Sequence, residues 1–434
     1  MNNNHCRFYC LIFFLCFVGI NYADETNPNS DDFLNYFDFI GYTRIGTGMS
    51  SSGDTQARFQ APGAPAAYRL GNESNIGLEA GLRFTYPLDR STGKKIEALY
   101  FVSDYQSFGD EKEFYRDPQV LQAYVNLEKV LRSDLNVWFG RMYYERKDIH
   151  LNDYFWLDNG LNAKFGAGIE LATKMGELKL AAFHMEDDDD SLVSHIKSYA
   201  VDARLLDIEL TKDHKLNLFA EYVSRDGGDP LTIDGSTIIS KDKDGFGLGL
   251  WVDSQLTEEI TNTAVLLYRQ GAAFRQYGTA NPIREDQGYD LDDAHYWEIN
   301  NSLVYDSDAY SVGWGTVIRA EEHGNGSNSK LHWLSTGIRP IVYLTDHVNI
   351  AIEAGVDYVD NEALDVNGQL TKVTAALQLS KSRGYYSRPV LRLFATQAYW
   401  SEDFEGLVGN SPDDAPYAED RNGFSVGIQF EHWW

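Results

Sequence analysis

The chain of 434 residues has little of three things that many proteins depend on. Its three cysteines, Cys6, Cys10 and Cys16, all lie within the first sixteen residues, so the rest of the chain can form no disulfide, thiolate metal site or cysteine nucleophile. Basic residues are also scarce: 37 Lys and Arg stand against 65 Asp and Glu, and this net charge of -28 disfavours nucleic-acid binding. After the first 23 residues, no apolar run approaches the roughly 18 residues that a membrane helix needs.

The first residues have the pattern of a secretory signal peptide. Arg7 precedes an apolar run over residues 11–20, and Tyr22-Ala23 offers a cleavage site. We therefore predict a signal peptide over residues 1–23, which leaves a mature chain without cysteine. Residues 24–38 are polar, contain Pro28 and are predicted to form a short exposed lead-in.

Aromatic residues are abundant, at 14% of the chain, although the mean hydropathy is only -0.39. The last eleven residues, FSVGIQFEHWW, place Phe424, Val426, Ile428 and Phe430 on one parity and mostly polar residues on the other. Successive side chains of a strand point to opposite faces, so this stretch is half apolar and half polar. A transmembrane β-barrel combines such strands with aromatic girdles. A closing strand of a soluble sandwich, a secreted lectin or a secreted glycan enzyme is the alternative.

Strand-like runs recur along the chain in pairs that tight polar turns connect, and longer segments separate the pairs. With a first strand over residues 39–46 and a last over 424–434, we count about 18 strands. This predicts an all-β antiparallel transmembrane barrel over residues 39–434, with short periplasmic turns, long extracellular loops and both termini periplasmic. The predicted pairs are 76–88 with 95–102, 120–129 with 135–144, 168–173 with 178–185, 200–210 with 215–223, 246–252 with 260–269, 296–305 with 310–319, 331–343 with 348–359, and 373–380 with 389–398.

Acidic residues gather in the long loops, as in the runs EDDDD at residues 186–190 and DQGYDLDD at 286–293. A solvated outer face explains them, and divalent-ion bridging at the cell surface is the alternative. The sequence lacks the G-x-S-x-G, H-E-x-x-H and P-loop patterns, and its histidines lack metal-ligand spacing. We therefore expect no enzyme activity, no cofactor and no bound metal.

Four blocks of sequence resemble the maltoporin family, the sugar-specific porins of bacterial outer membranes. They are DFIGYTRIGTG at residues 38–48, FQAPGAPAAYRLGNE at 59–73, GRMYYERKDIHLNDYFWLD at 140–158, and a C-terminal set made of GIRP at 337–340, SRPVLRLFAT at 387–396 and the final Trp433-Trp434. The resemblance does not extend clearly through residues 160–330.

This resemblance implies an 18-stranded homotrimer in the bacterial outer membrane, in contact with lipid and lipopolysaccharide. It further implies facilitated diffusion of maltose and maltodextrin-type oligosaccharides past a line of lumen aromatics and a charged constriction. The chemistry is consistent with this, because aromatic rings suit the apolar faces of sugar rings and ionised groups hydrogen-bond strongly to hydroxyls. Weak repeated binding also suits passage better than one tight site.

Nine residues match the sugar-binding positions of the family. Tyr42, Tyr386 and Trp433 match aromatic positions, and Phe155 stands where a constriction tyrosine is usual. The charged positions are matched by Arg44, Arg69, Arg146, Asp148 and Asp153. For Trp433 a place in the interface girdle is the alternative, and for Arg146, Asp148 and Asp153 a solvated loop.

The chain also departs from the family pattern. Arg58 and Ser74 occupy the positions of a family disulfide, Gly77 that of a lumen tyrosine, and Leu121 that of a lumen arginine. Phe114 or Tyr115 could replace a tryptophan that reaches in from a neighbouring subunit. The aromatic line is thus thinner than usual, so sucrose or a β-glucoside, amino acids or ions, and an adhesin or phage-receptor role remain alternatives. The acidity of the chain predicts a preference for cations.

Overall fold

The computed structural model describes residues 33–53, 55–107, 118–159, 163, 165–187, 196–227, 231–233, 236–238, 242–274, 291–324, 330–409, 417 and 420–434. The predicted signal peptide, Phe114, Tyr115 and most of the two acidic runs lie outside these residues. Within them, no helix is both long enough and apolar enough to cross a membrane. Two short 3-10 helices, η1 at Phe33–Tyr36 and η3 at Glu402–Phe404, accompany the strands.

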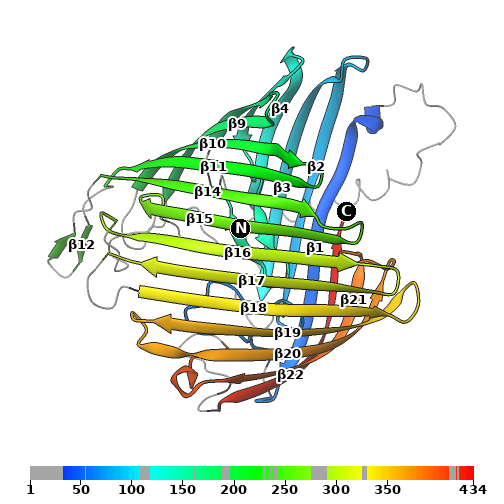
Figure 1. The fold of residues 1–434 in the computed structure, drawn as a ribbon, viewed down its shortest axis with the longest axis vertical. Coiled ribbons are helices and arrows are strands. Elements are labelled where there is room, and N and C mark those ends of the chain that lie inside the picture. The colour runs from blue at the N-terminus through cyan, green and yellow to red at the C-terminus, as the bar shows by residue number, and fades with distance from the viewer. Residues whose placement is uncertain are drawn as a thin grey trace, which may run out of the picture.

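Eighteen of the strands form one closed antiparallel sheet (Figure 1), and the structure has two further hairpins, β6–β7 and β12–β13. The strands are β1 (Phe37–Ser50), β2 (Asn75–Asp89), β3 (Lys94–Ser107), β4 (Gln119–Arg132), β5 (Leu135–Arg141), β6 (Lys147–Ile149), β7 (Tyr154–Leu157), β8 (Phe165–Ala172), β9 (Glu177–Asp187), β10 (Ile196–Thr211), β11 (His214–Arg225), β12 (Leu231–Ile233), β13 (Ser236–Ile238), β14 (Lys243–Gln255), β15 (Ile260–Gly271), β16 (His295–Asp306), β17 (Tyr310–Glu322), β18 (Lys330–Tyr343), β19 (Val348–Asn361), β20 (Val366–Ser380), β21 (Val390–Trp400) and β22 (Asn422–Trp433).

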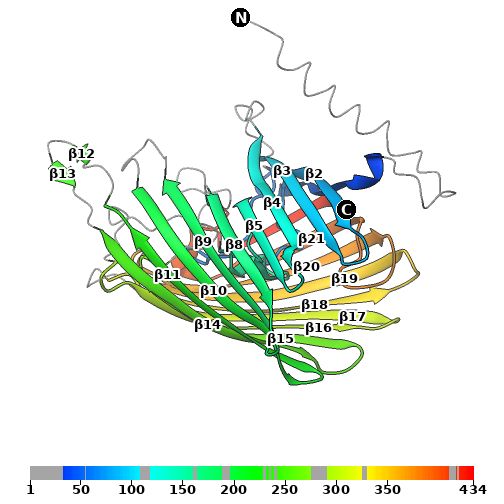
Figure 2. The ribbon, with the colours of Figure 1, turned by 90° about the horizontal axis from the view of Figure 1, so that it is seen from above.

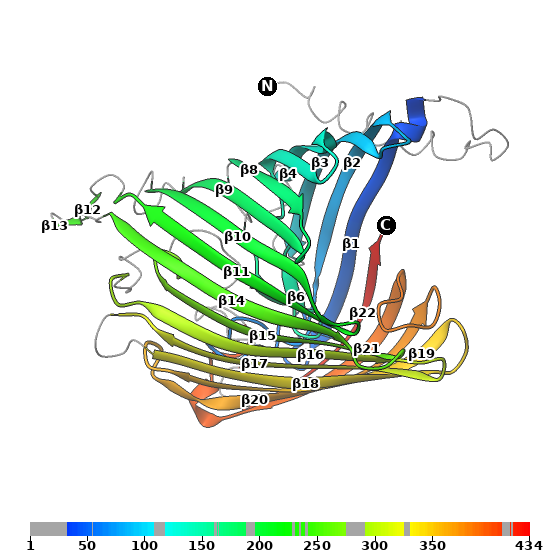
Figure 3. The ribbon, with the colours of Figure 1, turned by 45° about the horizontal axis from the view of Figure 1, so that its top comes forward.

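Each wall strand pairs with the next wall strand along the chain, and the ring closes where β22 pairs with β1 (Figure 3). In that register Tyr42 lies opposite Trp433 and Arg44 opposite Glu431. Closure removes the unpaired edges that an open sheet would expose. The prediction of an all-β antiparallel barrel of about 18 strands is therefore confirmed.

The two faces of the wall have opposite polarity, as β20 illustrates. Lys372 and Thr374 point inward and are 1% and 0% exposed, whereas the outward Leu377 and Leu379 are 49% and 54% exposed. The same alternation occurs in β22, where Phe424, Val426 and Ile428 are exposed. A soluble protein hides its apolar side chains, whereas a barrel with a polar interior and an apolar exterior suits lipid.

Two segments leave the ring and enter the lumen, residues 51–74 and residues 142–159. The first is fixed by Tyr68, whose ring lies against the paired glycines Gly337 and Gly355. A Cβ at either glycine would lie 2.2 Å from that ring, so only glycine leaves room for it. Ile149, in the second segment, occupies a similar place against Gly315. These segments narrow the interior and bring polar side chains together there.

Several predicted strand bounds need correction, and two hairpins were not predicted. β5 ends at Arg141 rather than at residue 144, because the chain turns into the lumen there. β20 begins at Val366, seven residues before the predicted start. The prediction missed these residues because Asn367, Gly368 and Gln369 do not alternate between apolar and polar side chains. The hairpin β12–β13, which Figure 2 shows beyond the ends of β11 and β14, and the hairpin β6–β7 are too short to show a period.

The connections differ between the two ends of the barrel. At the end where β1 begins and β22 finishes, short connections join consecutive wall strands. These connections are residues 90–93, 133–134, 173–176, 212–213, 256–259, 307–309, 344–347 and 381–389. The lumen segments emerge from the opposite end. That end also holds one connection of only four residues, between Asn361 and Val366, where a long loop was predicted.

Candidate functional site

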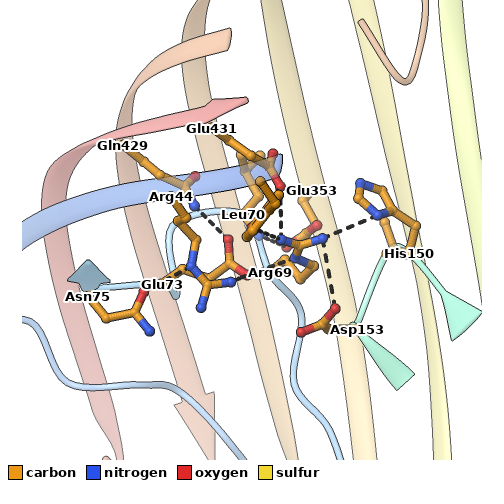
Figure 4. A network of polar contacts seen from close by, with 12 residues as sticks. Arg44, Arg69, Leu70, Glu73, Asn75, His150, Asp153, Glu353, Gln429 and Glu431 are labelled. Carbon is orange, nitrogen blue, oxygen red and sulfur yellow. Dashed lines mark hydrogen bonds and ion pairs between the residues drawn. The ribbon is translucent and has the colours of Figure 1, made fainter. Parts of the chain in front are cut away.

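Arg69 is the centre of a polar network inside the barrel (Figure 4). Its Nε donates to Glu73 at 2.7 Å and its Nη2 to Glu431 at 2.9 Å. Its Nη1 lies 3.2 Å from Nδ1 of His150 and 3.8 Å from Asp153. Arg69 and Glu73 come from residues 51–74, His150 and Asp153 from residues 142–159, and Glu431 from β22, so one guanidinium joins both lumen segments to the wall.

Glu73 accepts a second guanidinium, that of Arg44 on β1. Arg44 Nη1 lies 2.5 Å from Glu73, and Arg44 Nε donates to Asn75 at 2.9 Å. Burial raises the pKa of Glu73, but the charges of Arg44 and Arg69 outweigh burial and lower that pKa to about 2. Glu73 is therefore ionised at any physiological pH and holds both arginines in place.

Glu431 holds three arginines. Besides Arg69, it accepts Arg388 Nε at 2.7 Å and Arg392 Nη2 at 2.8 Å, and it is 1% exposed. Tyr42 also donates its hydroxyl to Glu431, at 3.3 Å. A buried carboxylate with several guanidinium donors is strongly held, because each bond is charge-assisted. This arrangement fixes the cationic side chains at the point where β1 meets β22.

Aromatic rings lie beside this cluster around His150. The ring centroid of His150 is 5.3 Å from that of Tyr386 and 6.1 Å from that of Trp433. The Arg388 guanidinium lies 4.5 Å over the Trp433 ring, and Arg388 Nη2 lies 3.3 Å from Nε2 of His150. Burial, together with the charges of Arg69 and Arg388, lowers the pKa of His150, which keeps the imidazole neutral.

The hairpin β6–β7 contributes the remaining predicted residues. The Arg146 guanidinium lies between two rings, 3.8 Å from the centre of Tyr143 and 4.9 Å from that of Phe155. Burial and then repulsion from Asp153 raise the pKa of Asp148 to about 6, although Arg69 and Arg146 oppose the rise. Asp148 therefore titrates near neutral pH.

Two cavities of about 240 Å³ each flank this region. Asp148, Arg146 and Tyr386 line the first, together with Thr263 and Ser302 of the wall. The second is lined by Asp153 and by Arg44, Arg58, Arg69 and Glu73. The hairpin thus contributes one carboxylate to each cavity, so both cavities offer hydrogen-bonding groups next to an aromatic or guanidinium surface.

Arg69 contacts Tyr42 and Asp153 directly, and it is linked to Arg44 through Glu73. Trp433 lies opposite Tyr42 in the strand register, and His150 contacts the rings of both Trp433 and Tyr386. Arg146 and Phe155 contact each other, and Asp148 shares a cavity with Arg146 and Tyr386. Among the described residues, no hydrogen bond, ion pair or ring contact links Phe155 to Tyr42 or Trp433. Phe155 therefore lies apart from the Tyr42–Trp433 pair.

Sequence reasoning missed several residues of the network. Glu73, His150 and Arg388 lie within the matched blocks, and Glu431 lies two residues before the final Trp433-Trp434. His150 also continues the alternation of Arg146 and Asp148. Tyr105 was also missed. It pairs in register with Gly77, and a Cβ at Gly77 would lie 2.5 Å from its ring. A tyrosine from β3 thus covers the place where β2 lacks one.

The other departures from the family pattern have structural counterparts. Beside Arg58 and Ser74, the Asn72 side chain bonds both backbone groups of Phe59, accepting from its N–H at 2.7 Å and donating to its carbonyl at 2.8 Å. These two hydrogen bonds join Asn72 to Phe59 across the segment, where the chain has no disulfide. Leu121 lies at a β-bulge, since Phe101 pairs with Gln122 and Val102 with Val120.

The part of the chain that the structure describes holds no group of three or more His, Cys, Asp or Glu placed to hold a metal ion. Several buried charged groups of the site are paired with one another, as Glu431 is with three arginines. The site offers a ligand hydrogen-bonding groups and aromatic rings.

Comparison with known proteins gave a family match over most of the chain. The sequence profile of the LamB porin family matches residues 37–434. Among solved structures, a loop-deletion mutant of OmpT from Vibrio cholerae is 10% identical, covering 92% of this chain and 99% of that chain at a TM-score of 0.42. Wzi from Escherichia coli, described as a carbohydrate-binding β-barrel, is 12% identical, covering 91% and 84% at a TM-score of 0.44. These structural likenesses are too loose to bear on function.

Proposed function

Because the chain belongs to the LamB porin family and lies in the outer membrane, we propose that it is a sugar-selective porin. In this proposal it gives facilitated diffusion to maltose and maltodextrin-type oligosaccharides. It has no catalytic activity and no bound cofactor. The substrate passes the aromatic rings of Tyr42, Trp433 and Tyr386 and the charged groups beside them.

One observation supports this proposal most strongly, the meeting of aromatic and charged groups at His150. Trp433 is 38% and Tyr386 47% exposed, so both rings have free surface, while the arginines beside them are held by carboxylates. A sugar ring has apolar C–H faces and a hydroxyl rim. A path with free rings on one side and fixed donors on the other suits both surfaces.

The orientation and assembly belong to the same proposal. The barrel end that carries both β1's start and β22's finish faces the periplasm, and the opposite end faces the cell exterior, with lipid and lipopolysaccharide around the apolar wall. The chain forms a homotrimer, as the family resemblance implies. Migration on a detergent gel before and after boiling tests the barrel against a soluble fold, because folded barrels shift on heating and soluble proteins generally do not. The apparent mass of the unheated band tests the trimer.

Liposome swelling tests the transport function. Liposomes that contain the purified protein are placed in isosmotic maltose, maltotriose, sucrose or a neutral amino acid, and the swelling rate reports entry of the solute. We expect maltose to enter faster than sucrose, a disaccharide of the same size, and maltotriose to enter faster than its larger size alone would allow. Faster entry of sucrose would change the substrate within the sugar class, and equal rates for all solutes would contradict sugar selectivity.

A further inference from the structure

The turn at residues 381–389 between β20 and β21 enters the barrel from the end opposite to the two lumen segments. Its neighbours at that end, residues 307–309 and 344–347, are shorter. Tyr385, in the middle of this turn, is only 4% exposed, although connecting residues ordinarily lie on the surface. Tyr386 and Arg388 come from the same turn. The position of this turn therefore decides where two groups of the site lie.

The carboxylate of Asp306, at the end of β16, holds the turn from the outside. Its Oδ2 accepts the backbone N–H of Tyr385 at 3.2 Å, and its Oδ1 accepts the hydroxyl of Tyr343 at 3.4 Å and that of Ser311. Tyr343 in turn accepts the backbone N–H of Gly384 at 2.9 Å. Gly384 has a φ of 121°, which favours glycine and lets the chain bend inward here.

The ring of Tyr385 holds the turn from the inside. It lies against Gly313 of β17, where a Cβ would be 2.2 Å from the Tyr385 hydroxyl oxygen and 2.3 Å from the adjacent ring carbon. Any side chain at residue 313 would displace this ring. The rings of Tyr385 and Tyr386 meet edge to face at 4.9 Å, so a displaced Tyr385 moves Tyr386 as well.

We propose that Asp306 and Gly313 are positioning residues of the sugar path. They hold residues 381–389 inward, so that Tyr386 and Arg388 meet His150. Neither residue contacts the sugar, and both act through Tyr385. This inference rests on the proposed sugar-binding function. The placement of Tyr386 can nevertheless be measured without sugar.

The first test compares Asp306→Asn with Asp308→Asn in planar bilayers. The asparagine at residue 306 can turn an amide N–H toward the N–H of Tyr385, which removes an acceptor. Asp308 lies two residues away, and among the described residues its carboxylate takes part in no hydrogen bond or ion pair, so it controls for the lost charge. We expect sugar block of the ion current to weaken about tenfold in Asp306→Asn, since charge-assisted bonds are lost, and to stay unchanged in Asp308→Asn.

Two further readouts separate positioning from a general defect. The open-channel conductance without sugar and the heat-dependent gel shift should match the wild type in both variants. Gly313→Ala is the second variant, and it should weaken sugar block in the same way without removing a charge. If Asp306→Asn loses the gel shift, that variant does not fold, and the sugar block of Gly313→Ala then tests the proposal.

A labelling experiment tests the placement of Tyr386 directly. The predicted mature chain lacks cysteine, so Tyr386→Cys introduces a single thiol, and a charged methanethiosulfonate reagent reports its accessibility through the current. We expect Asp306→Asn or Gly313→Ala in this background to raise the labelling rate at least about fivefold, and Asp308→Asn to leave it unchanged. Equal labelling rates in all variants would overturn the positioning role. A wild-type channel that no sugar blocks would instead refute the proposed function, and the labelling result would still stand.

Discussion

Two parts of the lumen wall use the same kind of ion pair for different purposes. We call the strands β10, β11, β15, β16 and β17 the docking wall, and the strands β1, β21 and β22 the path wall. Both walls present arginine–carboxylate pairs to the interior. On the docking wall, Arg269 donates to Glu221 at 2.6 Å, and Asn159 of the lumen segment bonds Arg269 and Glu221 at 2.9 and 3.0 Å. On the path wall, the pairs around Glu431 lie beside Trp433, which is 38% exposed.

The surroundings of an ion pair therefore decide its role. The pairs of the docking wall are closed off by Asn159 and by Tyr154, whose hydroxyl accepts from Arg319 at 2.8 Å, so they attach residues 142–159 to the barrel. The pairs of the path wall fix donors beside free aromatic surface. Breaking a docking pair should therefore affect stability, and changing a path residue should affect sugar binding.

The largest effect is expected on the docking wall. Glu221→Gln removes a carboxylate that is 4% exposed and leaves the Arg269 guanidinium without its ionic partner. Breaking a buried pair in this way costs about 3–5 kcal/mol. The temperature at which the folded band disappears on a detergent gel should fall. Glu128→Gln, at the partly exposed pair with Lys95, serves as the control and should change the stability by about 1 kcal/mol or less.

The next effect is expected on the path wall. Trp433→Ala or Tyr42→Ala should weaken sugar block of the ion current by about 1–3 kcal/mol, by analogy with aromatic stacking on flat ligands. The gel-shift temperature should change less than in Glu221→Gln. Tyr399→Ala, on the outward face of β21 and 58% exposed, is a matched aromatic control and should leave the block unchanged. Unaltered block in Trp433→Ala would remove this residue from the path.

A smaller effect is expected at Tyr105. It covers Gly77 and donates its hydroxyl to Glu79 at 2.7 Å, so it presents a ring near Tyr42. Its strand, β3, lies two strands farther from Trp433 than β1, which carries Tyr42. Tyr105→Ala should weaken sugar block by about 1 kcal/mol, at the low end of the aromatic range. Tyr105→Phe should retain the block, because the ring rather than the hydroxyl would contact sugar. Equal losses in both variants would assign the role to the hydroxyl.

The smallest effect is a pH dependence of ion preference. The acidic chain predicts a cation-preferring pore, and Asp148 has a pKa of about 6 beside Asp153, Arg69 and Arg146. Asp148 is mainly ionised at pH 7.5 and mainly protonated at pH 5, so acidification through about pH 6 should reduce the cation preference. Reversal potentials across a salt gradient measure it. Asp148→Asn should lack this step, and an identical step in the variant would assign it to another group.

The sequence made the barrel predictable because its wall strands carry their polarity in every second residue, as in residues 424–434. Strand ends were less predictable where that alternation is weak, as at Asn367–Gln369, or where the chain leaves the wall, as after Arg141. Within the site, Tyr42, Arg44 and Trp433 could be placed on one face by parity. The contacts of Glu431 with Arg69 and Arg388 could not, because they join residues far apart in sequence and depend on how the lumen segments fold.

Tyr105 shows the same limit in a single residue. Gly77 was recognised as lacking a ring, but the ring that covers it comes from the neighbouring strand, and only the register of β2 with β3 brings the two together. Register depends on pairing geometry across the whole sheet. Sequence patterns thus predict which face a residue takes more readily than which residue lies beside it.

Single-channel conductance of the purified protein in a planar bilayer, titrated with maltose, maltotriose, sucrose and a neutral amino acid, measures whether the lumen binds sugar. A path of free rings and fixed charged donors predicts saturable block by sugars that tightens with maltodextrin length, and no block by the amino acid. An open channel whose current no sugar alters would contradict the proposed sugar selectivity and assign this porin to another class of solute.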